Sequence, residues 1–343
     1  MKAQLIHKIV NIDGKENPLI LSEISEPVPV ENELLIKVHT CGVCHTELDE
    51  IEGRTSLPVL PVIPGHQVVG RVIATEARDS NFEIGDRVGV GWIYSSCGKC
   101  EYCLEGNDNL CPEFKATGRD ANGGYAEYMK APESSAFLIP EIFSDSEAAP
   151  LLCAGAIGYR SVRLANFIDG DFLGLTGFGA SAHLVLKMVK HKYPLTRIFV
   201  FARSEKERKF AKELGAEWVG DISKKSPEKL HSIIDTTPVW TPMIESLKNL
   251  KPGGRLVVNA IRKEDTDKKK LSNISYPEHL WMEKEIKSVA NVSVNDIKEF
   301  LEIASQIPIK PEYQEYSLTD ANKALIELKQ RKIRGAKVIV INK

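Results

Sequence analysis

Four cysteines in one short segment have the spacing of a metal-binding site. Two residues separate Cys97 from Cys100 and Cys100 from Cys103, and seven residues separate Cys103 from Cys111. A structural zinc ion takes four thiolates in a tetrahedron with bonds of about 2.3 Å, and a tight loop can turn such sulfurs toward one point. Ferredoxins bind iron–sulfur clusters with similar spacings, and oxidised cysteines would form disulfides. Taken alone, the segment indicates a structural metal site that holds zinc or an iron–sulfur cluster.

Three more potential metal ligands, Cys44, His66 and Cys153, lie far apart in the sequence. A catalytic zinc keeps three protein ligands and one open position, and two cysteines with one histidine are a known set. Each residue alone has an ordinary alternative, because a lone buried cysteine is usually a small apolar residue. Cys41, Cys44 and His45 also match the c-type haem attachment pattern and the spacing of a redox dithiol. Haem attachment would need export and an oxidising assembly route, which nothing in the sequence supports. A redox dithiol would need a thioredoxin-like βαβ context, which is missing, so a catalytic metal is the hypothesis we retain.

Length and composition limit the class of protein. A chain of 343 residues is too long for one ordinary core, so we expect two domains. The formal net charge of -2 provides no basic surface for nucleic acid. No apolar run approaches the roughly 18 residues of a membrane span, and the first residues lack the apolar core of a signal peptide. We therefore expect a cytoplasmic protein without nucleic-acid or membrane partners, in which cysteine clusters favour metals over disulfides.

The pattern of predicted secondary structure changes near residue 154. Before it, short β-branched runs at 34–38, 68–73 and 86–90, separated by turn residues, predict an irregular β-barrel, which the apolar run at 336–341 could close. After it, apolar strands alternate with amphipathic helices. Strands are expected at 172–176, 197–201, 232–235 and 255–258, and helices at 180–190 and 204–214. This alternation predicts an α/β domain with a parallel, doubly wound sheet.

A glycine-rich turn follows the first strand of that second region. Gly177, Gly179 and Ala182 form a G-x-G-x-x-A pattern between a predicted strand and a predicted helix, which begins at Ala180. Gly177 would make the tight turn, and Gly179 would let the backbone approach a pyrophosphate at the positive end of the helix. Ala182 is small enough for the helix to pack closely on the sheet. The pattern predicts a Rossmann dinucleotide-binding site.

The end of the next strand indicates which dinucleotide binds. An NAD site has an acid at this point, to hydrogen-bond the ribose hydroxyls, but the strand ends in Ala202, Arg203 and Ser204. Arg203 and Ser204 could bind a 2′-phosphate, with Lys206 or Arg208 nearby. The alternative for Ser204 is a helix N-cap. We expect NADP(H) to be favoured over NAD(H).

All these motifs together resemble those of the medium-chain, zinc-dependent alcohol dehydrogenases, over nearly the whole chain. Gly-Val-Cys-His-Thr at 42–46 and Pro-Gly-His at 64–66 precede the four-cysteine segment, and Leu-Leu-Cys-Ala-Gly at 151–155 follows it, in the family's order and spacing. The resemblance implies a GroES-like catalytic domain, of irregular β-barrel form, at 1–153 and 291–343. It implies a Rossmann cofactor-binding domain at 154–290.

The resemblance also implies two zinc ions per subunit. The catalytic zinc would bind Cys44, His66 and Cys153. The structural zinc would bind Cys97, Cys100, Cys103 and Cys111, in a lobe at about 93–113. Cys41 is then left as a structural thiol.

Roles for the residues around the catalytic zinc follow from the same resemblance. Thr46 matches the hydroxyl that relays the alcohol proton, and Asp49 stands where the relay ends. His45 matches a position that contacts a cofactor phosphate, and Trp92 matches an aromatic wall of the substrate pocket. Zinc would stabilise the alkoxide of the alcohol, as it lowers the pKa of bound water, and the alkoxide would transfer a hydride to nicotinamide.

Two positions depart from the family pattern. Gln67 stands where relatives commonly have a glutamate after the ligand histidine, so that negative charge is missing beside the metal. Asp49 stands where a histidine often ends the proton relay, and a carboxyl ordinarily has the lower pKa. We therefore expect differences in metal exchange and in the pH optimum.

The predicted function is a zinc-dependent alcohol dehydrogenase or aldehyde reductase acting on small molecules, and a homo-oligomer, either a tetramer or a dimer. Polyol, sugar or cinnamyl-type alcohol dehydrogenases of the same fold are the alternative. A non-catalytic zinc- and nucleotide-binding relative would be expected to lack a catalytic ligand, and all three ligands are present.

Overall fold

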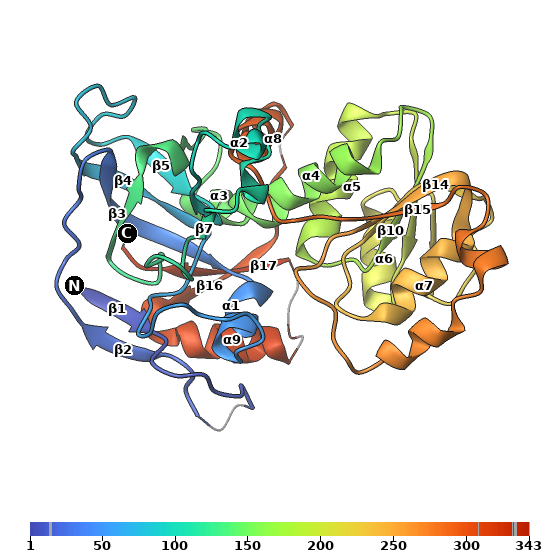
Figure 1. Ribbon diagram of the computed structural model, residues 1–343, viewed down its shortest axis with the longest axis horizontal. Coiled ribbons are helices and arrows are strands. Elements are labelled where there is room, and N and C mark those ends of the chain that lie inside the picture. The colour runs from blue at the N-terminus through green and yellow to red at the C-terminus, as the bar shows by residue number, and fades with distance from the viewer. Residues whose placement is uncertain (14–15, 308, 331, 333–334, 343) are drawn as a thin grey trace. The chain divides into compact units, whose positions relative to one another are not determined.

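The computed structural model describes residues 1–13, 16–307, 309–330, 332 and 335–342. The chain forms two compact units (Figure 1). The first unit contains Met1–Cys153, Val292–Gln306 and Lys310–Lys343, and the second contains Ala154–Asn291 with Ile307–Ile309. Along the described part of the chain, no helix combines the length and the apolar character that crossing a membrane requires.

A seven-stranded sheet lies at the centre of the described part of the first unit. Its strands are β3 (Glu33–Val43), β4 (Val68–Thr75), β5 (Arg87–Val90), β8 (Tyr128–Pro132), β9 (Ala136–Leu138), β16 (Tyr313–Ser317) and β17 (Ala336–Val340). They follow the order β16-β17-β3-β4-β5-β9, and β8 pairs with β3. Leu34, Ile36 and Val38 alternate with less buried residues along β3, because successive side chains of a strand point to opposite faces. This period-two pattern gives the sheet one apolar face for the core.

The end of the chain returns to the first unit. β17 pairs antiparallel with β3, so that Ile339 lies opposite Cys41. Cys41 is fully buried in the apolar cluster that also contains Ile36, Val68 and Tyr125. Cys41 is therefore a core residue in this unit.

Short strands and helices complete the first unit. They are β1 (Lys2–Leu5), β2 (Ile20–Glu23), β6 (Ile93–Ser95), β7 (Lys115–Ala116), α1 (His45–Ile51), α2 (Glu101–Leu104), α3 (Asp145–Ala148), α8 (Val294–Gln306) and α9 (Ala321–Lys329).

The second unit contains a parallel sheet, six-stranded in the described residues. Its strands are β10 (Phe172–Thr176), β11 (Arg197–Phe201), β12 (Trp218–Gly220), β13 (Leu230–Asp235), β14 (Leu250–Val258) and β15 (Glu285–Ser288). The helices are α4 (Ala154–Ala165), α5 (Ala180–Lys192), α6 (Glu205–Glu213) and α7 (Trp240–Asn249). The strand order β12-β11-β10-β13-β14-β15 reverses direction at β10. In such sheets ligands bind outside the carboxyl ends of the strands at this reversal.

Candidate active site and metal centres

Cys44, His66 and Cys153 converge within the first unit. One potential ligand atom from each lies within 4.8 Å of the other two. The Cys44 and Cys153 sulfurs are 4.0 Å apart, and Nε2 of His66 is 3.4 Å from the Cys153 sulfur. Two sulfurs on a tetrahedral zinc with bonds of about 2.3 Å would be roughly 3.8 Å apart. The three side chains therefore fit an ion of the size of zinc.

Neighbouring strand ends bring these ligands together. Cys44 follows β3 in extended conformation and is the N-cap of α1, while His66 lies just before β4. The amide of Gly42 donates to the Gln67 carbonyl at 2.9 Å, which fixes the two strand ends against each other. A Cβ on Gly42 would come within 2.9 Å of the Cβ of Gln67, so this approach requires glycine. Cys153 directly follows the 3-10 turn Ala149–Leu152.

Glu47 connects two of the three ligands, a role that the motif comparison did not assign. Its Oε1 lies 2.8 Å from Nδ1 of His66, and its Oε2 accepts the Cys44 amide at 2.7 Å. Such a carboxylate directs the other ring nitrogen toward a metal and raises its basicity. Burial raises the pKa of the Glu47 carboxyl, and His66 acts in the opposite direction. Glu47 thus places a carboxyl group beside His66, although the residue that follows this ligand in the sequence is Gln67.

Glu50 lies one turn further along α1 and is almost fully buried. Neither of its carboxyl oxygens has a hydrogen-bond partner among the described residues. Burial, and then the like charge of Glu47, raise the pKa of Glu50 well above its usual range.

The other predicted active-site residues lie around the same ligands. Oγ1 of Thr46 is 3.6 Å from the Cys44 sulfur. The ring of Trp92 meets that of His66 edge-on, with centroids 4.9 Å apart. Asp49 is buried, and Nε of Arg54 donates to its Oδ1 at 2.6 Å. His45, the first residue of α1, is exposed. Arg54 is a further participant that the sequence motifs did not indicate.

Cys97, Cys100, Cys103 and Cys111 also converge, with all four sulfurs within 4.8 Å of one another. The sulfur of Cys103 lies 3.9 Å from that of Cys97 and 3.5 Å from that of Cys100. Backbone amides of Cys97 and Glu113 donate to the Cys111 sulfur at 3.4 and 3.3 Å. Such donors stabilise thiolates, and the amides of Lys99 and Cys100 lower the pKa of Cys97 to about 6. This donor set suits a closed tetrahedral metal site.

The predicted dinucleotide motif forms the turn from β10 into α5. Gly177 has φ +80°, and its amide donates to the Phe201 carbonyl at 2.8 Å. A Cβ there would come within 2.9 Å of Oγ1 of Thr236, whereas one on Gly179 would meet no atom within 4 Å. Gly179 is the N-cap of α5, and Ala182 is fully buried. The turn therefore leaves open space at the helix N-terminus, where a phosphate would bind.

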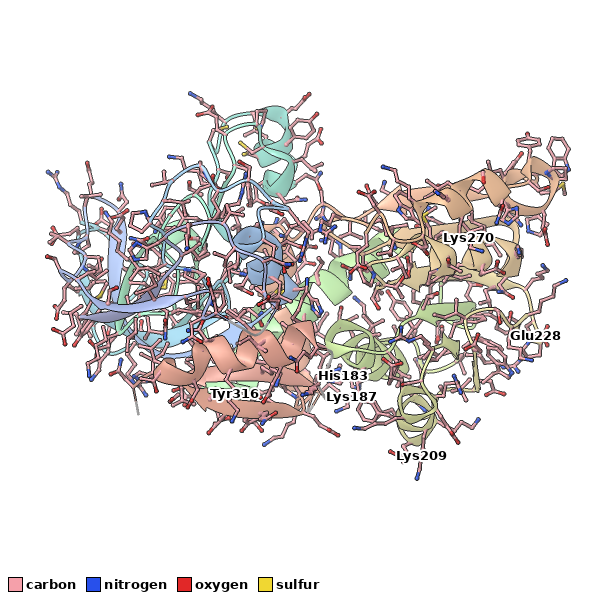
Figure 2. All side chains as sticks on the ribbon, turned by 90° about the horizontal axis from the view of Figure 1, so that it is seen from below. His183, Lys187, Lys209, Glu228, Lys270 and Tyr316 are labelled. Carbon is pink, nitrogen blue, oxygen red and sulfur yellow. The ribbon has the colours of Figure 1, made fainter. Side chains whose placement is uncertain are left out.

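The segment after β11 lies beside this turn, because Phe210 of α6 packs against Phe178 and against His183 of α5, labelled in Figure 2. Ser204 is the N-cap of α6. Its Oγ accepts the Glu207 amide at 3.1 Å and donates to Oε2 of Glu207 at 2.8 Å. The capping role that the sequence left open is thus present.

Of the two arginines after β11, Arg208 is engaged with the backbone and Arg203 is exposed. Nη1 of Arg208 donates to the Ala202 carbonyl at 2.7 Å and to the Arg203 carbonyl at 2.8 Å. Arg203 is exposed at the carboxyl end of the sheet. Arg203 therefore offers an accessible positive charge next to Ala202, and Lys206 of α6 is exposed as well.

Comparison with known proteins identifies the family. The family described as "Alcohol dehydrogenase GroES-like domain" matches residues 30–141. A probable alcohol dehydrogenase of Mycobacterium tuberculosis is 40% identical over 320 residues, which cover 92% of this chain and 90% of the relative. The chain belongs to the medium-chain alcohol dehydrogenases. It is an oxidoreductase that acts on alcohols, as the sequence predicts.

Solved structures agree on the fold. The crystal structure of an NAD-dependent alcohol dehydrogenase aligns with a TM-score of 0.87 at 23% identity, and the alignment covers all of both chains. The structure of CAD from Helicobacter pylori complexed with NADP(H) aligns with a TM-score of 0.85 at 22% identity, over 99% of each chain. The predicted fold class, a GroES-like domain with a Rossmann-like parallel sheet, is confirmed.

Proposed function

We propose that this chain is a zinc- and NADP(H)-dependent alcohol dehydrogenase that interconverts small alcohols with their carbonyl products. The convergence of Cys44, His66 and Cys153, with Glu47 behind the imidazole, is the observation that carries the proposal. When bound there, zinc supplies a Lewis acid that lowers the pKa of an alcohol. Two thiolates and one imidazole leave one position of a tetrahedron for the substrate.

The surrounding residues then bind the substrate and move its proton. Oγ1 of Thr46, close to the Cys44 sulfur, would accept the alcohol proton while its own hydroxyl proton passes on toward the cofactor ribose. Asp49 lies three residues further along α1 and ends the relay, with its carboxylate oriented by Arg54. Trp92, beside His66, forms a wall of the substrate pocket, and the exposed His45 contacts a cofactor phosphate.

Glu47→Gln is expected to weaken zinc binding by roughly 10- to 100-fold, the usual effect of losing a carboxylate behind a ligand histidine. The amide retains the size of the side chain but loses the negative charge beside His66. Zinc content after dialysis against graded chelator, together with kcat/KM, measures the effect.

Glu147→Gln is the matched control for Glu47→Gln. Glu147 also accepts its N-cap amide, that of Ser144 at 2.8 Å, but its ion-pair partner is Lys310 and not a metal ligand. The control should retain zinc as the unmodified enzyme does. A Glu47→Gln enzyme that also retained zinc at every chelator concentration would contradict the role of Glu47.

We propose that the four-cysteine cluster holds a structural zinc, in a lobe spanning about 93–113. Residues 1–153 and 291–343 would form the catalytic domain, and residues 154–290 the cofactor domain. All seven cysteines are free thiols, which suits the reducing cytoplasm, where we propose that the enzyme acts.

The proposed preference for NADP(H) rests on Arg203. Its guanidinium is exposed at the end of β11, where Ala202 replaces the acid of an NAD site. Arg203→Leu is expected to lower kcat/KM for NADP(H) by about 10- to 100-fold, because a charged hydrogen bond contributes roughly 1.5–3 kcal/mol. Activity with NAD(H) should change less than about twofold.

Arg197→Leu is the control for this measurement, since it removes the same charge at the opposite end of β11. It should leave the ratio of kcat/KM for the two cofactors unchanged. A strong preference of the unmodified enzyme for NAD(H) would contradict the cofactor assignment.

A panel of alcohols and aldehydes, assayed with both cofactors before and after chelation, tests the proposed function as a whole. Simple primary and secondary alcohols are expected to be oxidised, with loss of activity on chelation. A preference for polyols, sugars or cinnamyl alcohols would transfer the enzyme to the alternative class of the same fold.

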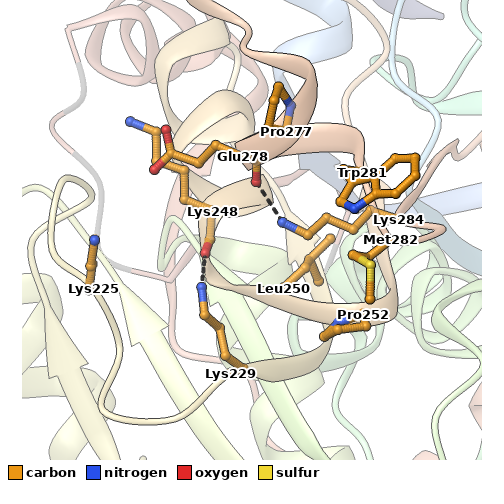
Figure 3. A pocket seen from close by; sticks show the side chains of 10 residues that line it. All are labelled: Lys225, Lys229, Lys248, Leu250, Pro252, Pro277, Glu278, Trp281, Met282 and Lys284. Carbon is orange, nitrogen blue, oxygen red and sulfur yellow. Dashed lines mark hydrogen bonds between the residues drawn. The ribbon is translucent and has the colours of Figure 1, made fainter.

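We also propose that the enzyme is a homo-oligomer, a dimer or a tetramer, that pairs through β15. All four residues of this edge strand are exposed, and an open strand edge is a template for pairing. Antiparallel pairing centred on Ile286 would place Glu285 opposite the partner subunit's Lys287. The exposed Trp281 and Met282 line an adjacent pocket of about 290 Å³ (Figure 3).

Ile286→Lys is expected to lower the molar mass in solution, because it puts two like charges at the centre of the proposed pairing. Light scattering after size-exclusion chromatography measures the mass against the 38.1 kDa of one chain. Ile168→Lys changes an exposed isoleucine outside the edge strand and should leave assembly intact. A monomeric unmodified enzyme would contradict the proposal.

A further inference from the structure

A buried amide of the second unit lacks a hydrogen-bond partner. Asn259 directly follows β14 and is 8% exposed. Its main-chain amide donates to the Asp235 carbonyl at 2.8 Å, but its Nδ2 has no partner among the described residues. A buried donor without a partner destabilises a fold, and such a group calls for an explanation. A ligand that brings an acceptor oxygen would provide one.

Another buried asparagine of the same unit behaves differently. Nδ2 of Asn249 donates to the carbonyls of Lys224 and Glu245, and its Oδ1 accepts the Ser226 amide at 2.9 Å. Asn249 thus holds backbone segments together. Asn259 makes no comparable side-chain bond from its Nδ2, so the structural role of Asn249 does not explain it.

The strand order gives the position of Asn259 relative to a bound dinucleotide. The pyrophosphate turn follows β10, and the adenosine ribose belongs at the end of β11, on one side of β10. The other half of the dinucleotide must then extend over β13 and β14. Strands lie about 4.8 Å apart, so Asn259 at the end of β14 stands roughly two spacings, or 10 Å, from the turn. The nicotinamide half is the part that would reach it.

The other polar side chains near Asn259 already hydrogen-bond to one another and to the backbone. Nζ of Lys263 contacts the Asp235 carboxylate at 2.5 Å and donates to the Thr237 carbonyl at 2.7 Å. The other Asp235 oxygen accepts the Thr237 hydroxyl at 2.8 Å, and Thr236 donates to the Thr176 carbonyl. The carboxylate of Asp235 is thus committed to these partners. Within the described residues, Nδ2 of Asn259 is enclosed without a partner, so its amide must turn outward to meet a ligand.

We propose that Nδ2 of Asn259 donates a hydrogen bond to the carboxamide oxygen of the cofactor's nicotinamide. This assignment rests on the proposed nicotinamide-dependent function and adds to it a residue that orients the ring. The carboxamide oxygen is an acceptor, as the unpaired donor requires, and it belongs to the half of the cofactor that the strand order directs over β14.

Calorimetric titration of the zinc-loaded enzyme with NADPH, NADH and ADP-ribose tests the proposal. Asn259→Ala should weaken the binding of NADPH and of NADH by about tenfold, which is the contribution of one neutral hydrogen bond. ADP-ribose, which lacks nicotinamide, should bind within about twofold of its affinity for the unmodified enzyme. Asn259→Asp should bind NADPH at least as weakly as Asn259→Ala, because its carboxylate faces an acceptor.

Thermal unfolding separates this role from a structural one. Without cofactor, Asn259→Ala should not lower Tm, since it removes a buried donor that has no partner. The control Asn249→Ala should lower Tm and leave the NADPH affinity unchanged.

Three results would overturn the proposal: NADPH binding within about twofold in Asn259→Ala, an equal loss of ADP-ribose binding, or tighter NADPH binding by Asn259→Asp than by Asn259→Ala. An unmodified enzyme that binds neither NADPH nor NADH would instead overturn the proposed function, before any variant is compared.

Discussion

Replacing Cys44 with serine is expected to lower kcat/KM for alcohol oxidation by roughly a thousandfold or more. The Cys44 sulfur lies 4.0 Å from that of Cys153, and serine would replace a thiolate with a neutral, weaker ligand. Metal stabilisation of developing oxygen charge contributes several kcal/mol, and about 1.4 kcal/mol corresponds to a tenfold change in rate. Steady-state kinetics and zinc content per chain, measured on the same folded preparation, provide the comparison.

Cys41→Ser is the appropriate control, because Cys41 lies only three residues before Cys44. Cys41 is a fully buried core residue outside the metal cluster. The control should lose stability but keep zinc and turnover per folded molecule. Equal losses of turnover in the two variants would mean that Cys44 acts through packing, and would contradict its assignment as a ligand.

Replacing Cys103 with alanine is expected to remove one zinc per chain and lower Tm by roughly 10 °C. Structural zinc contributes directly to folding free energy, and each kcal/mol that is lost lowers Tm by about 2–4 °C in a domain of this size. The Cys103 sulfur lies within 3.9 Å of those of Cys97 and Cys100, so its loss leaves an incomplete tetrahedron. Scanning calorimetry and metal analysis measure both effects.

The same Cys103 variant should retain hydride transfer in the molecules that remain folded. The two metal clusters share no ligand, so the loss of one leaves the Cys44 cluster complete. If the folded variant retained the second zinc and yet lost turnover as completely as Cys44→Ser, the separation into structural and catalytic sites would be wrong.

Both metal-ligand clusters could be predicted from the sequence, because their residues lie in short recognisable motifs. Cys97, Cys100 and Cys103 are separated by fixed gaps of two residues, and a loop of that spacing can bring its sulfurs together without knowledge of the fold. Cys44, His66 and Cys153 were connected only by their resemblance to a family. The β-α alternation after residue 154 predicted the parallel sheet, because strand and helix periods differ clearly there.

The residues that contact the metal ligands and Asp49 could not be predicted from the sequence, because these contacts depend on how distant segments pack together. Glu47 is recognisable as a capping-box residue three positions after Cys44, but its contact with His66 requires the pairing of β3 with β4. Gln67 adjoins the ligand in the sequence, whereas the carboxyl group beside His66 comes from α1. Arg54 was missed for a similar reason, since the chain must turn after α1 to bring it back to Asp49.

In the second unit, the role of Ser204 can be predicted from the local sequence, whereas the position of Asn259 depends on the tertiary fold. Ser204 caps α6, as a serine before an acidic first turn commonly does, so Arg203 carries more of the predicted phosphate recognition. Asn259 gave no sequence signal, because an asparagine after a strand ordinarily indicates a turn. Only the order of the parallel strands relates it to the glycine turn.

Removal and return of zinc tests the central claim most directly. The unmodified enzyme, stripped by chelation and reloaded with measured amounts of zinc, is assayed for alcohol oxidation while bound zinc per chain is determined. The account predicts two zinc ions per chain at full activity, loss of activity when the Cys44 cluster is empty, and recovery as it refills. Full activity in a preparation shown to contain no metal would contradict it.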